Sequence, residues 1–445
     1  MPELIRKKKK MSSFEMIAFG FAGVILFGAI ILMLPISSSA GVVTPFDKTL
    51  FTATSAVCVT GLVVVDTGSY WSAFGQAVIL LLIQTGGLGV ITVVASFSMV
   101  SGRKISLMQR STMQDAISAP KVGGIVRLTK FILQGTFLIE LVGAILMLPV
   151  FCRDYGWKGI WMSVFHSVSA FCNAGFDILG TTEQTFPSLT GYIANPLINL
   201  VIMLLIVIGG IGFLTWDDFC TNKWNLKRYR LQSKIILVTT AVLILLPAIF
   251  FFLSDFAGFS MGKRILASFF QSVTLRTAGF NTADLGAMND SSKAIMTLMM
   301  LIGGSPGSTA GGMKTTTIAV LILNAFATFG REAETEVFGR RFDNTVVKNA
   351  ATIAILYFFL FFTGGIAISQ IEHVALSDCL FETASAVGTA GLTLGITTEL
   401  GLVSHLILVV LMYLGRVGGL TLIYAAISVK IQSGAKRPLD KITVG

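Results

Sequence analysis

Charged residues and histidines are scarce in this chain. Of its 445 residues only 13% are charged, while 54% are hydrophobic, a balance far outside that of soluble domains of this length. The three histidines stand far apart, and few acidic residues fall within the apolar runs. The clustered polar groups that a membrane-embedded enzyme needs are therefore missing. This composition indicates an integral membrane protein that is not an enzyme.

Cysteine is rare as well, and its pattern argues against two common kinds of site. The chain has five cysteines, an odd number with no CxxC spacing, which disfavours both a disulfide framework and a zinc site. The histidines also lack metal-ligand spacing, and we interpret them as packing or interfacial residues. We expect no bound organic cofactor in this chain.

What the sequence has in abundance is long apolar runs. Eight are long enough to cross about 30 Å of hydrocarbon, near 14–36, 76–99, 131–151, 195–216, 235–253, 291–323, 350–369 and 403–428. The first run is nearly continuous and is followed by only a loose match to a cleavage site, so we interpret it as a retained span. The sequence predicts an all-α integral membrane protein with eight transmembrane helices.

The net charge of +10 raises the alternative of a nucleic-acid partner, but the positions of the basic residues favour a membrane. Most of the 33 Lys and Arg residues fall in the N-terminal IRKKKK, in 100–130, in 216–235, in 324–348 and after 429. All five segments lie on one side of the predicted membrane, which the positive-inside rule identifies as the cytoplasm. We expect both termini to be cytoplasmic, with anionic membrane lipid and an acidic partner, and no nucleic acid, facing this charge.

Four short polar segments lie between the spans and resemble one another. They are FTATSAVCVTGL (51–62), FHSVSAFCNAGF (165–176), FFQSVTLRTAGF (269–280) and FETASAVGTAGL (381–392). Each ends in a glycine followed by Leu or Phe, and these glycines are 114, 104 and 112 residues apart. The pattern indicates four copies of one unit, a span, a half-helix with a loop, and a second span. We place the units at 14–100, 125–217, 231–325 and 346–430, between a basic N-terminal segment 1–13 and a tail 431–445.

The predicted topology brings the four loops to one pseudo-fourfold axis. Every unit has the same orientation, and non-helical backbone at membrane depth is tolerated only against protein or a water-filled cavity. The loops carry no ring of Asp or Glu, so backbone carbonyls are the remaining ligands, and glycine can adopt the dihedral angles that turn them inward. The C-terminal ends of the half-helices add partial negative charge. The predicted potassium-selective filter consists of Val59, Thr60, Gly61, Asn173, Ala174, Gly175, Thr277, Ala278, Gly279, Thr389, Ala390 and Gly391.

These residues resemble the Trk, Ktr and plant high-affinity potassium transporter superfamily. Its members are four covalently joined span-pore-span units, each with one filter glycine, and the four phased glycines, RTAGF in the third unit and a broken sixth span all match. Within the superfamily the chain looks most like the KtrB-type membrane subunit of bacterial Ktr systems. The resemblance implies potassium selectivity, since a Ser at the first filter position marks sodium-permeable plant relatives and Gly61 stands there in this chain.

The resemblance also implies partners and a location. It predicts a homodimer in the bacterial plasma membrane, and a cytosolic ring of KtrA-type RCK subunits that binds ATP or ADP and regulates the pore. Sodium activation is a further expectation from the family, and nothing in the sequence locates its site.

The sixth apolar run is interrupted by GGSPGSTAGGMKTTT (303–317). Gly and Pro disfavour helix here, and the resemblance identifies the loop as an intramembrane gate below the filter. This run is the second span of the third unit, and we expect it to be the only second span that is broken. A phosphate-binding P-loop is disfavoured because Met313 separates the last Gly from Lys314, whereas a passive kink is the serious alternative. The predicted gate residues are Gly304, Ser305, Pro306, Gly307, Ser308, Thr309, Ala310, Gly311, Gly312, Lys314 and Arg416.

Three charged residues inside the apolar runs need separate interpretation. Arg416 pairs either with carbonyls of the gate loop, hindering cation exit, or with Glu140 as a packing anchor. Arg276, directly before TAGF, is expected to point behind the filter and to brace its loop with hydrogen bonds. Glu140 is interpreted as the partner of a buried base.

The resulting prediction is potassium uptake through a channel-like pore that is gated by the loop and regulated by a separate subunit. The alternative is a secondary cation transporter with alternating access, which predicts inverted repeats and broken helices in corresponding positions of two halves. The sequence disfavours that alternative because the four units are parallel and only one appears broken.

Overall fold

The computed structural model describes residues 12–100, 105–119, 121–332 and 334–418. In this part of the chain there are seventeen α-helices, four 3-10 helices and one two-stranded sheet. The α-helices are α1 (Ser13–Met33), α2 (Phe46–Val57), α3 (Thr67–Tyr70), α4 (Ala73–Leu88), α5 (Val90–Val100), α6 (Leu107–Ile117), α7 (Ile125–Tyr155), α8 (Lys158–Phe171), α9 (Pro196–Gly210), α10 (Phe213–Asn222), α11 (Leu231–Leu253), α12 (Met261–Thr274), α13 (Asp290–Met300), α14 (Thr315–Phe329), α15 (Asn344–Glu372), α16 (Leu376–Gly388) and α17 (Leu402–Val417).

The remaining elements are short. The 3-10 helices are η1 (Pro35–Ser37), η2 (Thr190–Tyr192), η3 (Leu226–Arg228) and η4 (Ile396–Thr398), and antiparallel strands β1 (Glu336–Val337) and β2 (Arg340–Arg341) form a hairpin. The helical fold agrees with the prediction apart from this hairpin. Three predicted parts of the chain lie wholly or partly outside the described residues. They are the basic N-terminal segment up to residue 11, the end of the fourth unit from residue 419, and the whole tail 431–445.

The apolar runs appear as helices of two kinds. Four helices, α1, α7, α11 and α15, are each long and apolar enough to cross a membrane. Two helix pairs pass the same test together but are sharply bent, α4 with α5 by 99° and α9 with α10 by 97°. Helices α14 and α17 are apolar but shorter. Length and composition therefore support four spans, or six if each bent pair is one span.

Helix boundaries follow from local chemistry. Ser12 and Glu15 form a reciprocal capping box at the start of α1, with Ser12 N donating to Glu15 Oε2 over 2.7 Å, which satisfies amides that have no partner within the helix. Asn195 caps α9 by accepting hydrogen bonds from two backbone amides, and Pro196 occupies the first helical position, where its missing N–H costs nothing. Polar caps thus begin apolar helices at fixed residues.

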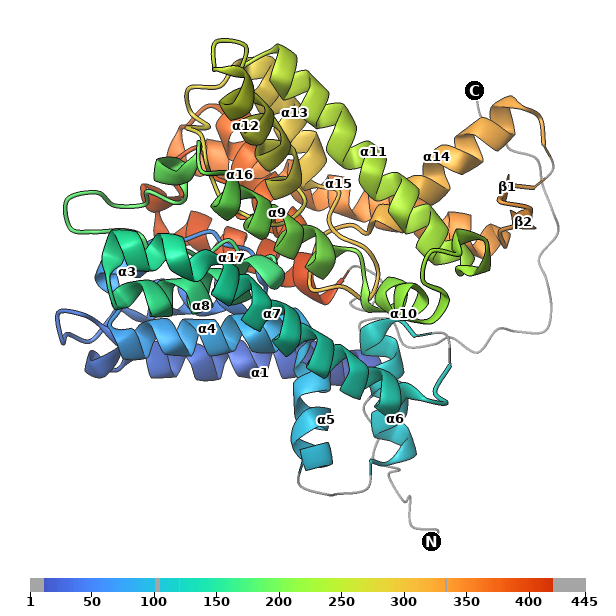
Figure 1. Cartoon of the computed structure of the whole chain (residues 1–445), viewed down its shortest axis with the longest axis horizontal. Helices are drawn as coiled ribbons and strands as arrows, with labels where there is room; N and C mark the ends of the chain where they lie inside the picture. Colours follow the sequence, from blue (N-terminus) through green and yellow to red (C-terminus); the bar gives the residue numbers. More distant parts are fainter. Residues whose placement is uncertain (1–11, 101–104, 120, 333, 419–445) are drawn as a thin grey trace, which may run out of the picture.

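Four short helices, α2, α8, α12 and α16, pack against the longer ones, and Figure 1 shows α8 beside α4 and α12 beside α11. Each packs against the long helix that precedes it, which is α1, α7, α11 or α15. Each also packs against an apolar helix of another part of the chain, in the pairs α4 with α8, α9 with α12, α13 with α16 and α17 with α2. Because the last pair joins the end of the described chain to its beginning, the contacts close a ring around the ends of the short helices.

The bends in α4–α5 and α9–α10 correct the expectation that only one second span is broken. They occur at Gly89 and Gly212, whose φ angles are 85° and 91°, and α17 ends in the same way at Gly418, with φ 90°. Their ψ angles lie between 132° and 140°, a combination that residues with a Cβ rarely adopt. The sequence does not predict these bends, because apolar residues continue past each glycine and the hydropathy shows one unbroken run.

Small residues let the apolar helices approach the short ones closely. A Cβ added to Gly86 would lie 1.9 Å from the carbonyl oxygen of Val57, at the end of α2. In the same way, a Cβ added to Gly209 would lie 2.0 Å from Phe171 O, at the end of α8. These glycines thus act in packing, as small residues do between membrane helices.

We therefore predict that Gly86→Ala destabilises the protein by about 1–3 kcal/mol, the usual cost of overpacking, because its methyl group would meet backbone rather than a flexible side chain. Thermal unfolding in detergent would show a lower midpoint. Gly23→Ala is the matched control, since a Cβ there meets nothing within 4 Å. An unchanged midpoint for Gly86→Ala would contradict the close packing.

Candidate functional site

The structure brings the four repeated glycines together. We call the segments 58–62, 172–176, 276–280 and 388–392 the glycine loops. A Cβ built on each loop's glycine would lie close to a carbonyl oxygen of the next loop. The contacts are Gly61 to Ala174 O at 2.7 Å, Gly175 to Ala278 O at 2.7 Å, Gly279 to Ala390 O at 3.0 Å, and Gly391 to Thr60 O at 2.0 Å. The loops thus form a closed ring in chain order, with a carbonyl oxygen at each junction.

All four glycine loops repeat the same unusual backbone. The glycines have φ angles from 69° to 97°, and the residue two positions before each glycine is also in the left-handed region. These residues are Val59 (φ 51°), Asn173 (φ 58°), Thr277 (φ 63°) and Thr389 (φ 52°). A β-branched residue such as Val59 adopts this conformation at a cost, and such residues persist where the surroundings hold them in place, often at functional sites.

Hydrogen bonds turn the loop amides back toward the short helices. The amides of Thr60, Ala174 and Ala390 each donate over 2.8 Å to the backbone carbonyl five residues earlier, in α2, α8 and α16. These bonds satisfy the last carbonyls of the helices. Because the loop amides face the helices, the carbonyls of the same loops are free to face one another at the ring.

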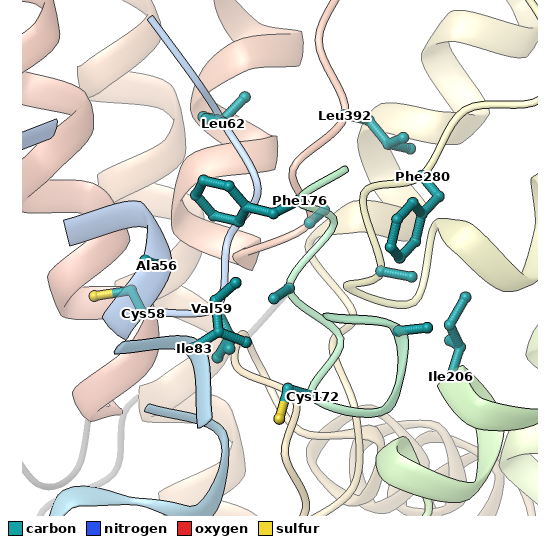
Figure 2. Close-up of a cluster of buried hydrophobic side chains, with 14 of the residues drawn as sticks. Ala56, Cys58, Val59, Leu62, Ile83, Cys172, Phe176, Ile206, Phe280 and Leu392 are labelled. Carbon is teal, nitrogen blue, oxygen red and sulfur yellow. The ribbon is translucent and has the colours of Figure 1, made fainter. Parts of the chain in front are cut away.

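Apolar side chains anchor the loops from outside the ring. The residue after each glycine is large and at most 1% exposed, and the four belong to one buried cluster, with Leu62, Phe176, Phe280 and Leu392. Figure 2 shows these side chains coming from four different loops. Burying large side chains at this position fixes each loop and leaves its backbone at the centre.

The ring offers neutral oxygen ligands. Among the described residues no group of three or more His, Cys, Asp or Glu could hold a metal ion. Besides the carbonyls, the side-chain oxygens Thr60 Oγ1, Asn173 Oδ1 and Thr389 Oγ1 are buried without a hydrogen-bond partner. Such a set suits a monovalent cation whose hydration shell is replaced by dipoles rather than by charges.

The interruption predicted in the sixth run lies between α13 and α14, at 301–314. We call residues 303–314 the interrupting loop. Its two ends are paired, because Gly303 N donates to Met313 O over 2.8 Å and Thr315 N donates to Gly304 O over 3.0 Å. The first and last residues of the loop therefore lie side by side, between the end of α13 and the start of α14.

Between its ends the interrupting loop bonds to the bends and ends of other apolar helices. Ser305 N donates to Gly210 O over 2.9 Å and Thr309 N donates to Gly209 O over 3.2 Å, both near the α9–α10 bend. Gly312 N donates to Gly415 O of α17 over 3.2 Å. The loop is thus held by two other parts of the ring.

The same loop touches the glycine loops and the helices that end there. The Thr309 hydroxyl donates to Phe171 O, at the end of α8, over 3.0 Å. A Cβ added to Gly311 would lie 2.2 Å from Thr389 Oγ1. Lys314 Nζ donates to Ala310 O over 2.7 Å, so its ammonium group stays on the loop's own backbone.

Arg416 connects the interrupting loop to α4. Its Nη1 donates to Thr309 O, and its Nη2 donates to Gly86 O and, over 3.2 Å, to Gly87 O. Of the two sequence interpretations, the geometry places Arg416 against loop carbonyls. Glu140 instead accepts a hydrogen bond from Gln84 over 3.3 Å.

The bracing hydrogen bonds expected of Arg276 are not formed. Its Nε and Nη2 atoms are buried without a partner, while its backbone oxygen accepts from Asn173 Nδ2 over 3.2 Å and its backbone amide donates to Val273 O over 3.1 Å. The expectation rested on the residue type, and the site supplies no acceptor aimed at the guanidinium group.

Two cavities border these elements. One of about 130 Å³ is lined by all four glycines and, farther out, by Asp66 and Asp177. A second, of about 260 Å³, is lined by parts of the interrupting loop, including Lys314, and by Arg416. The ring borders the first cavity and the loop borders the second.

The structure therefore assembles all the predicted filter positions into one ring and places the predicted gate residues beside it. Sequence reasoning missed the carbonyl acceptors in Gly86, Gly209 and Gly415. Their signal was present as small residues recurring at the same place in the second spans, but only the fold shows that they face the short helices and the loop.

Comparison with known proteins gives one consistent result. Residues 24–435 match the TrkH family, described as a cation transport protein. The chain is 37% identical to the potassium/sodium uptake protein NtpJ of Enterococcus hirae, over 99% of both chains. It is 36% identical to the Ktr system potassium uptake protein B of Bacillus subtilis, over 97% of this chain and 96% of that one.

A solved structure supports the fold independently. The potassium transporter TrkH from Vibrio parahaemolyticus matches with a TM-score of 0.74 and 18% identity, over 95% of this chain and 86% of that chain. The chain belongs to the TrkH family of cation transport proteins and is similar to the KtrB-type members of that family.

Proposed function

We propose that this protein mediates potassium uptake through a channel-like pore whose filter is the ring of glycine loops. The observation that carries the proposal is the closed ring, in which a carbonyl oxygen lies against the next loop's glycine at all four junctions. Relatives named as potassium uptake proteins, at 34–36% identity, agree with this ion. Potassium is the substrate, coordinated at the carbonyls of the filter.

The interrupting loop is proposed as the gate. It occupies the place next to the ring and is bonded to the α9–α10 bend, to α17 and, through Arg416, to α4. Two positive side chains, Lys314 and Arg416, border the cavity beside it, and they oppose cation exit while the loop is in place. A passive kink would need far fewer contacts than these.

The proposed topology has eight crossings in four span-pore-span units with both termini in the cytoplasm. The short helices α2, α8, α12 and α16 serve as pore helices, and the unit boundaries are those expected from the sequence. In this arrangement α13 with α14 forms one further crossing, and α17 belongs to the last one.

Regulation is proposed to come from outside this chain. Relatives named as components of a Ktr system are the reason to propose a cytosolic KtrA-type RCK ring that binds ATP or ADP, docked on a homodimer of this subunit in the bacterial plasma membrane. Sodium activation belongs to the same proposal, and a relative named for potassium and sodium uptake makes sodium the first ion to compare.

An alternating-access cation transporter is the second candidate, because bends at Gly89 and Gly212 show that the third unit is not alone in having a broken second span. The closed ring of four equivalent loops still favours the pore, since alternating access between inverted halves would pair the elements two by two.

We predict that the purified protein in liposomes takes up rubidium or potassium, with little competition from sodium or lithium. Gly279→Asp should abolish this flux, because its side chain would enter the ring between Gly175 and Gly391, both within 3.3 Å of the added Cβ. No flux from the wild type, even with a shortened interrupting loop, would reopen the alternating-access candidate.

Gly61→Ser is expected to admit sodium. The added side chain would meet Ala174 O at 2.7 Å in a backbone with φ 97°, so one quarter of the ring must rearrange. A fall of about tenfold in the potassium-to-sodium flux ratio corresponds to about 1.4 kcal/mol. An unchanged ratio would count against carbonyl coordination at this position.

Deletion of residues 306–312 should raise basal flux. The paired ends of the interrupting loop allow the chain to close after the deletion, while the bonds from Thr309 and Gly312 to other helices are lost. Flux measured without any partner subunit is the test, with Gly23→Ala as a control for handling. A silent deletion variant would favour the passive kink.

A further inference from the structure

The four glycine loops are not fastened to their helices in the same way. In three units, a hydroxyl on the short helix bonds directly to the loop. Ser55 Oγ accepts from Gly61 N over 3.1 Å, Ser169 Oγ donates to Phe176 O over 2.7 Å, and Thr274 Oγ1 donates to Phe280 O over 2.7 Å. Each of these bonds ends at the glycine or at the residue after it.

The fourth unit lacks this bond. Ser385 lies six residues before Gly391, as Ser169 lies six residues before Gly175, but its hydroxyl is buried without a hydrogen-bond partner. The last segment of the ring is therefore not held by the hydroxyl that holds its counterparts.

A carboxylate earlier in the same helix makes the missing connection. Glu382, which is 0% exposed, accepts from Thr393 Oγ1 over 2.7 Å, from Leu394 N over 2.9 Å and from Thr397 Oγ1 over 2.5 Å. These donors begin two residues after Gly391, so the carboxylate fixes the chain immediately after the fourth glycine loop. Hydrogen bonds to a carboxylate are stronger than those between neutral groups.

The equivalent positions in the other units do not do this. Thr52, His166 and Gln271 each follow a buried phenylalanine on the short helix, as Glu382 follows Phe381. Thr52 bonds only to Lys48 O of its own helix, and the ring of His166 bonds only to Met162 O. Gln271 contacts Met296 Sδ. Among the described residues, the fourth unit is thus the only one in which the side chain at this position forms hydrogen bonds to the chain that follows the glycine loop.

We infer that Glu382 is a positioning residue for selectivity, holding the fourth glycine loop at the spacing that the other three loops obtain from their hydroxyls. The inference rests on the proposed potassium filter. Removing the carboxylate would release three donors at once, and the freed loop would lose its fixed carbonyl positions while the rest of the ring remained.

The test is the potassium-to-sodium flux ratio of Glu382→Ala in liposomes, normalised to folded protein. We expect the ratio to fall by at least about tenfold, equivalent to about 1.4 kcal/mol, because three hydrogen bonds are lost at once, and we expect Glu382→Gln, which keeps one acceptor oxygen, to lie between this variant and the wild type. The double variant Thr393→Val with Thr397→Val removes two of the same bonds from the other end and should lower the ratio as well.

Two matched controls separate positioning from general damage. Ser385→Ala changes a side chain one turn away that has no partner, and Thr52→Val changes the equivalent position in the first unit. Both should keep the wild-type flux ratio within about twofold, well short of the tenfold change, equivalent to about 1.4 kcal/mol, that is expected for Glu382→Ala.

Several outcomes overturn the inference. A folded Glu382→Ala protein with the wild-type ratio does so, as does an equal loss in either control. If Glu382→Ala does not fold, the threonine double variant decides, and a wild-type ratio in it rejects the role. A wild type that is itself unselective, with Gly61→Ser no different, instead rejects the proposed filter and the inference with it.

Discussion

Backbone groups inside a membrane must find partners within the protein, and this constraint organises the whole site. Four loops and three interrupted helices leave many amides and carbonyls without helical partners. The loop amides bond back into the short helices, and the amides of Ser305, Thr309 and Gly312 bond to carbonyls at the ends of α9 and α17. Arg416 supplies side-chain donors for the carbonyls of Gly86 and Gly87, near the end of α4. The bends and the interrupting loop therefore satisfy each other.

This mutual satisfaction connects packing to the proposed gating. If the loop moves away, the carbonyls of Gly209, Gly210 and Gly415 lose their donors, and only water can replace them. A cavity of about 260 Å³ already borders the loop, so there is space for water to reach these carbonyls. Under the proposed gating, opening and hydration of the space beside the loop are then one event. The proposed regulator would need to supply only the free-energy difference between the two sets of hydrogen bonds, rather than the cost of leaving carbonyls without partners.

The sequence predicted the parts of this site that leave a compositional trace. Phased glycines located all four loops, and the run of Gly, Ser and Pro located the interrupting loop, because such residues are unusual inside apolar helices. The bends at Gly89 and Gly212 were missed since apolar residues continue across them, and a single glycine does not reveal its φ angle. Arg276 was assigned hydrogen bonds that it does not make, because a residue type shows capacity and the fold decides whether an acceptor is near. The partners of Arg416 were undecided for the same reason.

The ring and the layer beside it obey different rules. In the ring, which we propose as the filter, all four units repeat one backbone, with two residues of positive φ in each glycine loop. Beside it the units differ. Gly86, Gly209 and Gly415 make the same contact with a short helix, yet the following residue is Gly87 in the first unit, Gly210 in the second and Arg416 in the fourth. Joining four copies in one chain allows this, since each copy can mutate alone. The third unit then carries the interrupting loop, and the fourth carries the guanidinium group of Arg416, which holds it. Glycine carbonyls of the first unit accept hydrogen bonds from Arg416, and glycine carbonyls of the second unit accept them from the loop. A symmetric ring beside an asymmetric set of loop contacts follows from covalent linkage, which an assembly of four identical chains could not provide.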